Sequence, residues 1–239
     1  MKQFNHAIVI GASSGIGAEL VKQLTASGCK VAALARREDR LKQLCVETGC
    51  FPYVHDVTNY DEIPALFQRI TTDLGGLDLV IYNSGIMPDI GPDEFDFTKD
   101  KAIIETNLLG AIAWLNQAAI RFDGTKSGSI VGIGSVAGDR GRAGQPVYNT
   151  SKAALTTYLE ALRNRLSSEG VKVVTIKPGP TDTEMTKDYH GSKASAADAA
   201  AFTLRKADRP GEHYVQFPHR IIFGILASIP SPIFRKLKI

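Results

Sequence analysis

The sequence predicts an α/β fold: a single doubly wound domain in which a seven-stranded parallel sheet is flanked by helices on both faces. Short apolar runs rich in Val, Ile and Leu alternate with longer amphipathic stretches, and most runs are bounded by Gly, Pro, Asn or Asp. Right-handed connections between successive runs then produce the doubly wound arrangement. The chain has 239 residues, 44% of them hydrophobic and 22% charged, so it can bury one large core.

Each element is placed by its composition and its boundaries. Strands are expected at residues 7–10, 30–35, 51–54, 77–82, 129–133, 171–176 and 213–217. Helices are expected between them at residues 16–27, 38–48, 61–74, 99–122 and 147–169. The first three helices stop before Gly28, Gly49 and Gly75, where a glycine supplies a left-handed cap.

The bulk composition excludes several classes of protein. Lys and Arg number 28 against 25 Asp and Glu, which is not the charge pattern of a nucleic-acid-binding protein. The three cysteines, Cys29, Cys45 and Cys50, are odd in number and lack metal-ligand spacing. We therefore expect buried or idle thiols in a reducing compartment, with no disulfide framework and no metal site. The first residues lack the pattern of a secretory signal, so the protein is expected to be cytoplasmic.

A glycine-rich segment joins the first strand to the first helix. Glycines there let the backbone approach a pyrophosphate held at the positive end of the helix. Their spacing, with three residues between the first two glycines and one before the third, departs from the commoner Gly-x-Gly-x-x-Gly fingerprint. A tight turn without a ligand is the alternative. The candidate cofactor contacts are Gly11, Ser13, Ser14, Gly15, Ile16 and Gly17.

The second strand is followed by Arg36 and Arg37. A site specific for NAD(H) places an acidic residue there, against the ribose 2′-hydroxyl. A guanidinium instead binds a 2′-phosphate through a bidentate fork and stacks on adenine. Arg36, together with Arg37, therefore favours NADP(H) over NAD(H), and solvated charge at a helix start is the alternative.

Two further strand ends carry candidate cofactor contacts. Asp56 and Val57 follow the third strand, and Asp56 could accept a hydrogen bond from an adenine amino group or cap a turn near Thr58. Asn83 and Gly85 end the fourth strand, where a glycine lets the chain pass close to a cofactor.

Tyr148 and Lys152 are candidates for proton transfer. Their i, i+4 spacing puts the phenol and the ammonium on one face of a helix. A phenol has a pKa near ~10 in water, and a nearby cation lowers it by favouring the phenolate. With Lys152 as activator, Tyr148 could donate a proton to a carbonyl oxygen as hydride arrives, or remove it from an alcohol in reverse. A surface pair without function is the alternative.

Two polar residues could complete this site. Ser135 follows the fifth strand, where its hydroxyl could position a substrate oxygen beside Tyr148 or merely form a turn. Asn107 lies in the middle of a predicted helix, a poor place for an amide unless it has a hydrogen-bonding task or marks a kink.

The combination resembles the short-chain dehydrogenase/reductase family from residue 6 to about residue 217. The glycine segment matches the family's Gly-x-x-x-Gly-x-Gly loop, and Asn83 with Gly85 matches its Asn-Ala-Gly element. Its catalytic tetrad is matched by Asn107, Ser135, Tyr148 and Lys152. The sequence departs from the family pattern at two positions. Ile10 replaces the threonine that commonly precedes the first glycine, and Ser84 replaces the alanine of Asn-Ala-Gly. Both departures are peripheral to the chemistry.

The resemblance implies a Rossmann-type fold and further roles. Lys152 would also bind the nicotinamide ribose, and Asn107 would hold a water through which protons reach Lys152. Arg36 fits the NADP(H)-preferring subgroup, and Asp56 the adenine-contacting position. The segment after the sixth strand is similar to the family's loop at that place, which lies near the nicotinamide and pyrophosphate. Its candidate cofactor contacts are Pro178, Gly179, Thr181 and Thr183. The family also implies a homodimer or homotetramer built through a contact between long helices.

Substrate choice is expected from residues 183–211, 87–97 and 137–145. Arg140 and Arg142 could meet an anionic substrate group or be solvated, and an alanine-rich helix at residues 192–205 could serve as a lid. We divide the chain into a dinucleotide-binding catalytic domain, 1–217, and an apolar, basic tail, 218–239. The tail is too short to span a bilayer and is expected to pack on its domain or at an interface, with a peripheral membrane contact as the less favoured alternative.

The leading hypothesis is an NADP(H)-dependent oxidoreductase acting on a small ketone, aldehyde or secondary alcohol, with an apolar 3-oxoacyl chain as the best single guess. The alternative is a dinucleotide-binding regulatory or scaffold protein without turnover. A third possibility is a protein that acts as a partner at a membrane surface.

Overall fold

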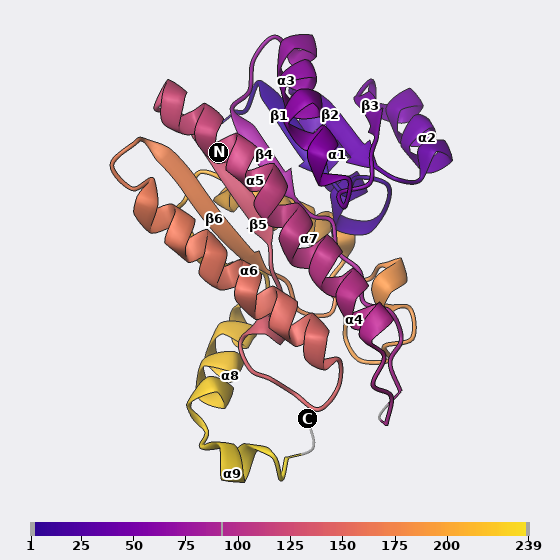
Figure 1. The fold of residues 1–239 in the computed structure, drawn as a ribbon, viewed down its shortest axis with the longest axis vertical. Coiled ribbons are helices and arrows are strands. Elements are labelled where there is room, and N and C mark those ends of the chain that lie inside the picture. The colour runs from indigo at the N-terminus through magenta and orange to yellow at the C-terminus, as the bar shows by residue number, and fades with distance from the viewer. Residues whose placement is uncertain (1–2, 92, 238–239) are drawn as a thin grey trace.

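Seven parallel strands form the centre of the structure (Figure 1). The computed structural model describes residues 3–91 and 93–237. The strand order is β3-β2-β1-β4-β5-β6-β7, which confirms the predicted doubly wound α/β fold. The strands are β1 His6–Ile10, β2 Lys30–Ala35, β3 Phe51–Val54, β4 Leu79–Tyr82, β5 Gly128–Ile133, β6 Val171–Lys177 and β7 Gly211–Tyr214.

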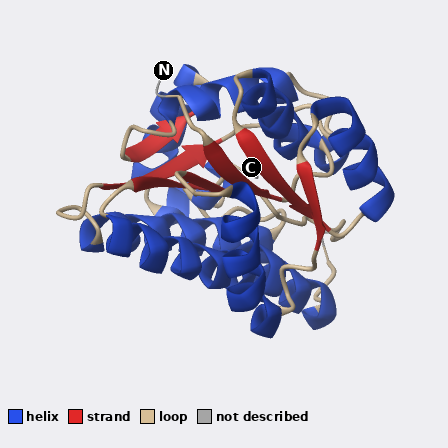
Figure 2. Ribbon diagram, turned by 90° about the horizontal axis from the view of Figure 1, so that it is seen from above, coloured by secondary structure: helices blue, strands red, loops and turns tan. Residues whose placement is uncertain are grey.

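Helices cover both faces of the sheet, as Figure 2 shows from above. One face carries α1 Gly15–Ala26, α2 Glu38–Thr48 and α7 Ala196–Lys206. The other carries α3 Ile63–Leu74, α5 Gly110–Thr125 and α6 Pro146–Arg165. Each face has its own hydrophobic core, because strand side chains alternate between the two sides. The strands that are buried on both faces therefore read as continuous apolar runs.

The strand order reverses beside β1. This strand pairs with β2 on one side and with β4 on the other, so the loops after β1 and β4 diverge at the carboxyl edge of the sheet. In open α/β sheets such a divergence leaves a crevice in which ligands bind. The glycine loop follows β1 and Asn83 follows β4, so both lie at this point.

The long helix predicted at residues 99–122 has an interruption. It consists of α4 Phe97–Ile104, a π-helical turn Glu105–Leu109 and α5. Tyr82 donates a hydrogen bond to the carbonyl of Thr106 at 2.6 Å, and Gly110 lies against Val57 and Tyr82. The extra residue of a π turn changes the direction in which its side chains point. It therefore re-aims Asn107, which lies in this turn.

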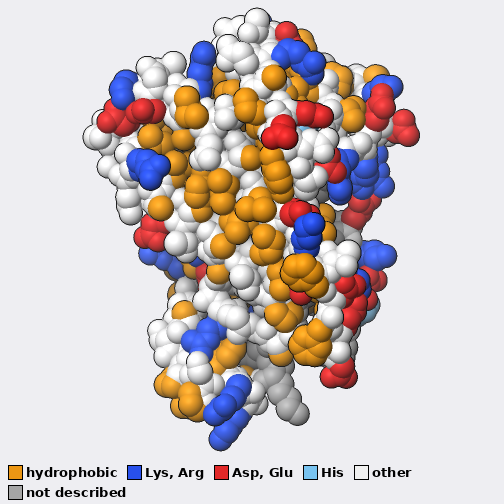
Figure 3. Space-filling view, viewed as in Figure 1, with side chains coloured by type: hydrophobic (Ala, Val, Ile, Leu, Met, Phe, Trp, Pro, Cys, Tyr) orange, Lys and Arg blue, Asp and Glu red, His pale blue; other side chains and the backbone are white. Residues whose placement is uncertain are grey.

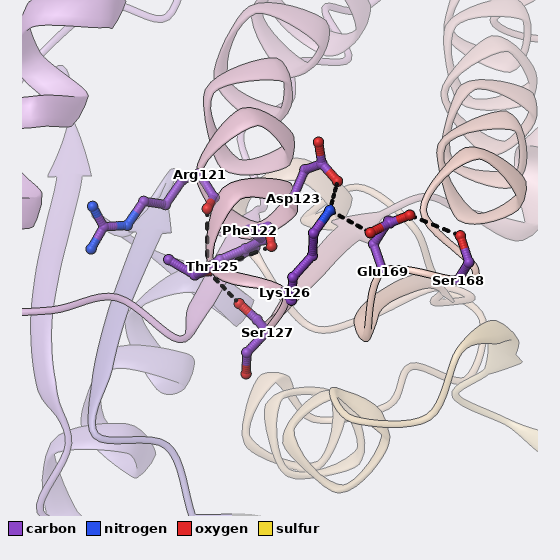
Figure 4. A network of polar contacts seen from close by, with 8 residues as sticks. All are labelled: Arg121, Phe122, Asp123, Thr125, Lys126, Ser127, Ser168 and Glu169. Atoms are coloured by element: carbon purple, nitrogen blue, oxygen red, sulfur yellow. Dashed lines mark hydrogen bonds and ion pairs between the residues drawn. The ribbon is translucent and has the colours of Figure 1, made fainter.

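The amino edge of the sheet is tied together by polar contacts (Figure 4). Lys126, which follows α5, pairs with Asp123 at 3.0 Å and with Glu169, which precedes β6. Glu169 also accepts a hydrogen bond from Ser168, and Thr125 donates to the carbonyl of Ser127. These contacts join the ends of α5 and α6 at the edge opposite the crevice.

Two predictions about local structure are wrong. The helix predicted as a lid at residues 192–205 is α7, which packs beside α1 and buries Ala199, Ala200 and Thr203. The apolar spacing of these residues serves the core and not a cleft. The last strand ends at Tyr214, and Phe217 begins the next helix, because Pro218 falls in the first turn of that helix, where a missing N–H is tolerated.

The cysteine expectation is also wrong, because Cys45 and Cys50 form a disulfide. Gly49 adopts a left-handed conformation and donates its N–H to the carbonyl of Cys45, which turns the chain back at the end of α2. The two Cα atoms are 4.7 Å apart as a result. Cys29 remains a free, buried thiol.

The tail forms α8 Phe217–Ser228 and the short α9 Ser231–Phe234, both below the sheet in Figure 1. None of the helices within residues 3–91 and 93–237 has the length and hydropathy needed to cross a membrane.

Close packing of α6 on β5 sets the position of the helix that carries Tyr148. A Cβ added at Gly132 of β5 would overlap the side chain of Leu159 on α6. We expect Gly132→Ala to lower the free energy of unfolding by about 1–3 kcal/mol, because a filled core accepts an added methyl only by shifting the helix. Urea unfolding followed by circular dichroism would measure this.

Gly124→Ala is the matched control, because nothing lies within 4 Å of the added Cβ and Gly124 is in a helix. Its stability should stay constant or rise by up to about 1 kcal/mol. Equal effects of the two substitutions would contradict the packing argument.

Candidate active site

The three glycines of the loop after β1 are each required by a close contact. A Cβ at Gly11 would lie 2.6 Å from the backbone nitrogen of Ser84, and one at Gly15 would lie 2.9 Å from Thr183. A Cβ at Gly17 would overlap the carbonyl of Gly11. Gly11 and Gly15 also have positive φ angles of 90° and 54°. The loop therefore lies tightly against the segments that follow β4 and β6.

The amino end of α1 is open to an anion. Ser14 is its N-cap residue but makes no side-chain capping bond, and the first turn contains no acidic residue. The free N–H groups and the helix dipole of such an end attract a phosphate. Side chains are absent at Gly15 and Gly17, and Ile16 packs toward the core of the α1 face. These features fit the pyrophosphate of a dinucleotide.

An arginine cluster borders the same loop. Arg37 donates to the hydroxyl of Ser13 at 3.0 and 3.1 Å and to that of Ser14 at 2.5 Å. Its guanidinium also pairs with Glu184 at 2.7 Å, and Arg40 pairs with the same carboxylate. Two guanidinium groups and two hydroxyls therefore lie beside the end of β2.

Arg36 points to a different neighbour. Its Nη1 atom lies 3.4 Å from Oδ2 of Asp56, whose other oxygen accepts from the N–H and hydroxyl of Thr58. Asp56 thus caps the turn, which was one of its two predicted roles, and also pairs with Arg36 where β2 and β3 end. Val57 is buried in the core under α5, so only its backbone is available to a ligand.

The segment after β4 links the glycine loop to the catalytic residues. Asn83 donates its side-chain N–H to the carbonyl of Gly11 at 2.8 Å. A Cβ placed on Gly85 would lie 3.4 Å from both Oδ1 of Asn107 and Nζ of Lys152. Glycine at this position therefore leaves a space between these two polar groups.

Asn107 is fully buried in the π turn, with its amide occupied by hydrogen bonds. Its Oδ1 accepts from the N–H of Ile86 at 2.7 Å, and its Nδ2 donates to the carbonyl of Ile86 at 3.0 Å and to Ser151 at 3.1 Å. The hydrogen-bonding task and the helix irregularity, which the sequence offered as alternatives, occur together.

Tyr148, Ser135 and Lys152 meet at the carboxyl edge. Tyr148 and Lys152 lie in the first two turns of α6, and the Lys152 Nζ atom is 5.8 Å from the centre of the Tyr148 ring. Lys152 donates to the carbonyl of Ile133 at 3.0 Å, which ties α6 to the end of β5. Ser135 follows β5, and its hydroxyl accepts from the N–H of Ala137 at 3.0 Å and lies close enough to Tyr148 to act on its pKa.

The pKa of Tyr148 is shifted opposite to the sequence expectation. Burial raises the pKa of the phenol, and the neighbouring Ser135 hydroxyl and the charge of Arg142 only partly offset this effect. Burial also lowers the pKa of Lys152 to about 8. The phenol is therefore held in its protonated form, and Lys152 is the group that titrates near neutral pH.

The loop after β6 closes the other side of the crevice. Pro178 accepts from the N–H of Val136 at 3.1 Å, and the Thr181 hydroxyl donates to the carbonyl of Gly179 at 3.0 Å. Thr183 lies against Gly15 and donates to the carbonyl of Thr181 at 3.3 Å. Pro178 therefore contacts the Ser135 segment and Thr183 the glycine loop, whereas Gly179 packs against His219 and Thr181 bonds to Gly179.

The sequence did not reveal several supporting residues. Ser151 bridges Asn107 to the Tyr148 carbonyl, and Glu184 holds the arginine cluster. Buried Lys177 pairs with Asp139, just after Ser135, at 2.6 Å. Ser151 could have been found from its i+3 spacing after Tyr148, whereas the other two contacts join distant segments and leave no local pattern.

Comparisons agree with this arrangement. A family model described as short chain dehydrogenase matches residues 5–194. An uncharacterized oxidoreductase of Myxococcus xanthus is 36% identical over 240 residues, covering 97% of this chain and 95% of that protein. An acetoacetyl-CoA reductase of Shinella zoogloeoides is 34% identical over 187 residues, 76% of this chain and 76% of that protein.

A solved structure also has a similar fold. The structure of a short chain dehydrogenase from Burkholderia cenocepacia J2315 in complex with NADP superposes with a TM-score of 0.87 over 99% of both chains at 24% identity. The chain belongs to the short-chain dehydrogenase/reductase family. It is an oxidoreductase of the class that acts on CH–OH groups with a nicotinamide dinucleotide, as predicted.

The burial of Lys152 predicts a measurable effect on stability. Its pKa falls from an ordinary 10.5 to about 8 on folding, which corresponds to a penalty on the order of 3 kcal/mol for the charged side chain at neutral pH. Between those values the unfolded chain binds more protons, so folding becomes more favourable as the pH rises from about 8 to 10.5. Lys152→Met should remove this slope and raise the melting temperature at pH 7.

Unfolding in urea at pH 7 and pH 9.5 would test this. Lys101→Met is the control, because the Lys101 side chain is 61% exposed and should leave the slope unchanged. The same pH slope in wild type and Lys152→Met would contradict the buried-ammonium assignment.

Proposed function

We propose that this protein is an NADP(H)-dependent oxidoreductase that transfers hydride between the nicotinamide and a ketone, aldehyde or secondary alcohol, with Tyr148 as the acid/base. The supporting observation is the meeting of Ser135, Tyr148, Lys152 and buried Asn107 at the edge where the strand order reverses. A tyrosine and a lysine on the solvent-exposed face of a helix would have no such neighbours. The Tyr148 hydroxyl and Lys152 ammonium are instead withdrawn from water and held from three separate elements.

Preference for NADP(H) is supported by the arginine cluster. Arg37 and Ser13 together offer a guanidinium and a hydroxyl to a 2′-phosphate, while the end of β2 provides no acidic residue for a free 2′-hydroxyl. Arg36 would stack on or flank the adenine from its position at Asp56. The NADP complex of the Burkholderia protein agrees with this choice. When bound, the cofactor supplies or accepts the hydride.

The proton would pass through Tyr148. Because its raised pKa keeps it protonated, the phenol suits donation to a carbonyl oxygen that gains negative charge during reduction. Ser135 would hold the same oxygen in position. Lys152, with a pKa of about 8, would restore the proton through a water in the space that Gly85 leaves beside Asn107.

The substrate end and the assembly complete the proposal. An apolar 3-oxoacyl compound is the substrate class that we favour, in line with the acetoacetyl-CoA reductase among the relatives. We expect a cytoplasmic homodimer or homotetramer. Figure 3 shows hydrophobic side chains gathered over α5 and α6. Ile120 of α5 is exposed, and these helices offer a face for a second copy.

Removing the Tyr148 hydroxyl should abolish turnover. We expect Tyr148→Phe to lower kcat for carbonyl reduction by at least ~10²-fold with little change in cofactor affinity, because the proton donor is lost while the ring remains. NADPH oxidation over a panel of carbonyl compounds would measure the rate. Tyr158→Phe on the same helix removes a surface hydroxyl bonded to Asn116 and should keep full activity. A non-catalytic regulatory protein would show no turnover in either form.

The arginine cluster should decide which cofactor is used. Arg37→Ala is expected to raise the KM for NADPH by ~10–100-fold, the loss of one charge-assisted contact, with the KM for NADH unchanged. Arg40→Ala, which breaks an ion pair with Glu184 but touches neither serine, is the control and should change both values little. Arg36→Asp should improve the use of NADH by restoring a ribose acceptor. Unaltered cofactor preference in both Arg37→Ala and Arg36→Asp would refute the NADP(H) assignment.

A further inference from the structure

The C-terminal tail, which in the structure begins with α8 at Phe217, differs in charge from the rest of the chain. It contributes four of the 28 Lys and Arg residues, at positions 220, 235, 236 and 238, and none of the 25 Asp and Glu residues. The remaining chain is close to neutral by the same count. A segment with cations only and no acidic residue is complementary to a surface of negative charge.

The same tail exposes large apolar side chains. Helix α8 has no fully buried residue, and Phe217, Ile221 and Ile225 are 70%, 53% and 60% exposed. Their spacing of four residues places them along one stripe, which Ile222 widens. Exposed Ile233 and Leu237 follow, beside Arg235 and Lys236.

The other side of the tail is attached to the domain beside the candidate active site. Arg140, from the loop after Ser135, donates to the carbonyl of Ala227 at 2.9 Å and lies 4.5 Å from the centre of the buried Phe234 ring. His219 packs against Gly179 so closely that a Cβ on the glycine would overlap its ring. The tail is therefore held at the catalytic edge of the sheet (Figure 1).

Atoms near this attachment lack partners. Nδ1 of His219 and Oε1 of Gln216 are buried, yet neither has a hydrogen-bond partner among the described residues. Both belong to residues that contact the position of Gly179. The inner side of α8 thus packs against the loop after β6, while its apolar stripe faces outward.

We propose that residues 217–237 dock the protein on an anionic lipid surface and that its substrate is an apolar carbonyl compound or alcohol dissolved in that lipid. With twelve residues α8 is too short to span a bilayer, and it would lie in the interfacial plane with the stripe among acyl chains and the cations at the headgroups. Docking would bring the catalytic edge beside the lipid. The docking does not depend on the proposed oxidoreductase function, whereas the substrate class does.

A second copy of the chain fits this surface less well. A two-fold contact brings the same patch of each copy together. In a two-fold contact centred on the tail, the cations of the two copies would be opposed, with no acidic residue in either tail to neutralise them. An anionic bilayer meets the apolar stripe and the charge in one contact.

Co-sedimentation of the full-length protein with vesicles tests the docking. We expect at least tenfold more binding to phosphatidylcholine vesicles with 30% phosphatidylglycerol than to pure phosphatidylcholine, and a decline in 0.5 M NaCl. Ile221→Ser with Ile225→Ser, and separately Arg235→Glu with Lys236→Glu, should each abolish it. Val46→Ser is the matched control, because it removes an 87% exposed apolar side chain from α2.

A second measurement tests the substrate class. In the Ile221→Ser, Ile225→Ser variant, the reduction rate of 2-tridecanone carried in anionic vesicles should fall at least tenfold. The reduction rate of 2-butanone without vesicles should stay unchanged. Equal losses on both would show damage to the site and overturn the lipid-delivery step.

The remaining outcomes separate the hypotheses. The docking proposal is overturned if an active protein binds neutral and anionic vesicles equally, or binds neither kind. Concentration-dependent association that the tail variants abolish, with no vesicle binding, assigns the stripe to a second copy and also overturns it. Vesicle binding without turnover of any carbonyl leaves the docking intact and refutes the proposed function.

Discussion

The reversal of strand order between β1 and β4 is the constraint on which the site depends. All seven strands are parallel, so every chain segment that leaves a carboxyl end emerges at the same edge. The reversal opens that edge, and the glycine loop, Asn83 and the start of α6 gather around the opening. Gly132 then allows α6 to approach β5, which brings Lys152 to the carbonyl of Ile133.

Burial determines the electrostatics once these groups have met. A phenol and an ammonium four residues apart on a helix predict that the cation lowers the phenol's pKa. In the folded protein both lose their water, and this loss raises the pKa of Tyr148 and lowers that of Lys152. The spacing in the sequence supplies the proximity, and only the tertiary structure supplies the sign of the shift. The pair is thereby adjusted so that the lysine, and not the tyrosine, changes its charge near neutral pH.

Much of the fold could be predicted because its signals are local. Residues 30–35 and 51–54 are apolar runs between turn formers, and the structure has strands at those bounds. Contacts between distant segments left no such signal. The Cys45–Cys50 disulfide depends on the turn at Gly49, and the burial of α7 depends on α1 lying beside it. Asn107 is unusual in the middle of a helix, but neither the π turn in which it lies nor the close contact of Gly110 with Val57 leaves a local pattern in the sequence.

The two edges of the sheet are held in different ways. The contacts of Lys126 with Asp123 and Glu169 fasten one edge by side chains that belong to the ends of the helices themselves. The carboxyl edge, where the candidate site lies, is formed by the long loops that follow the strands. A scaffold secured at its base tolerates lengthening or exchange of those connections without loss of the core. New substrate ranges can therefore arise in this architecture by evolution of loops alone, while the hydride and proton chemistry is inherited unchanged.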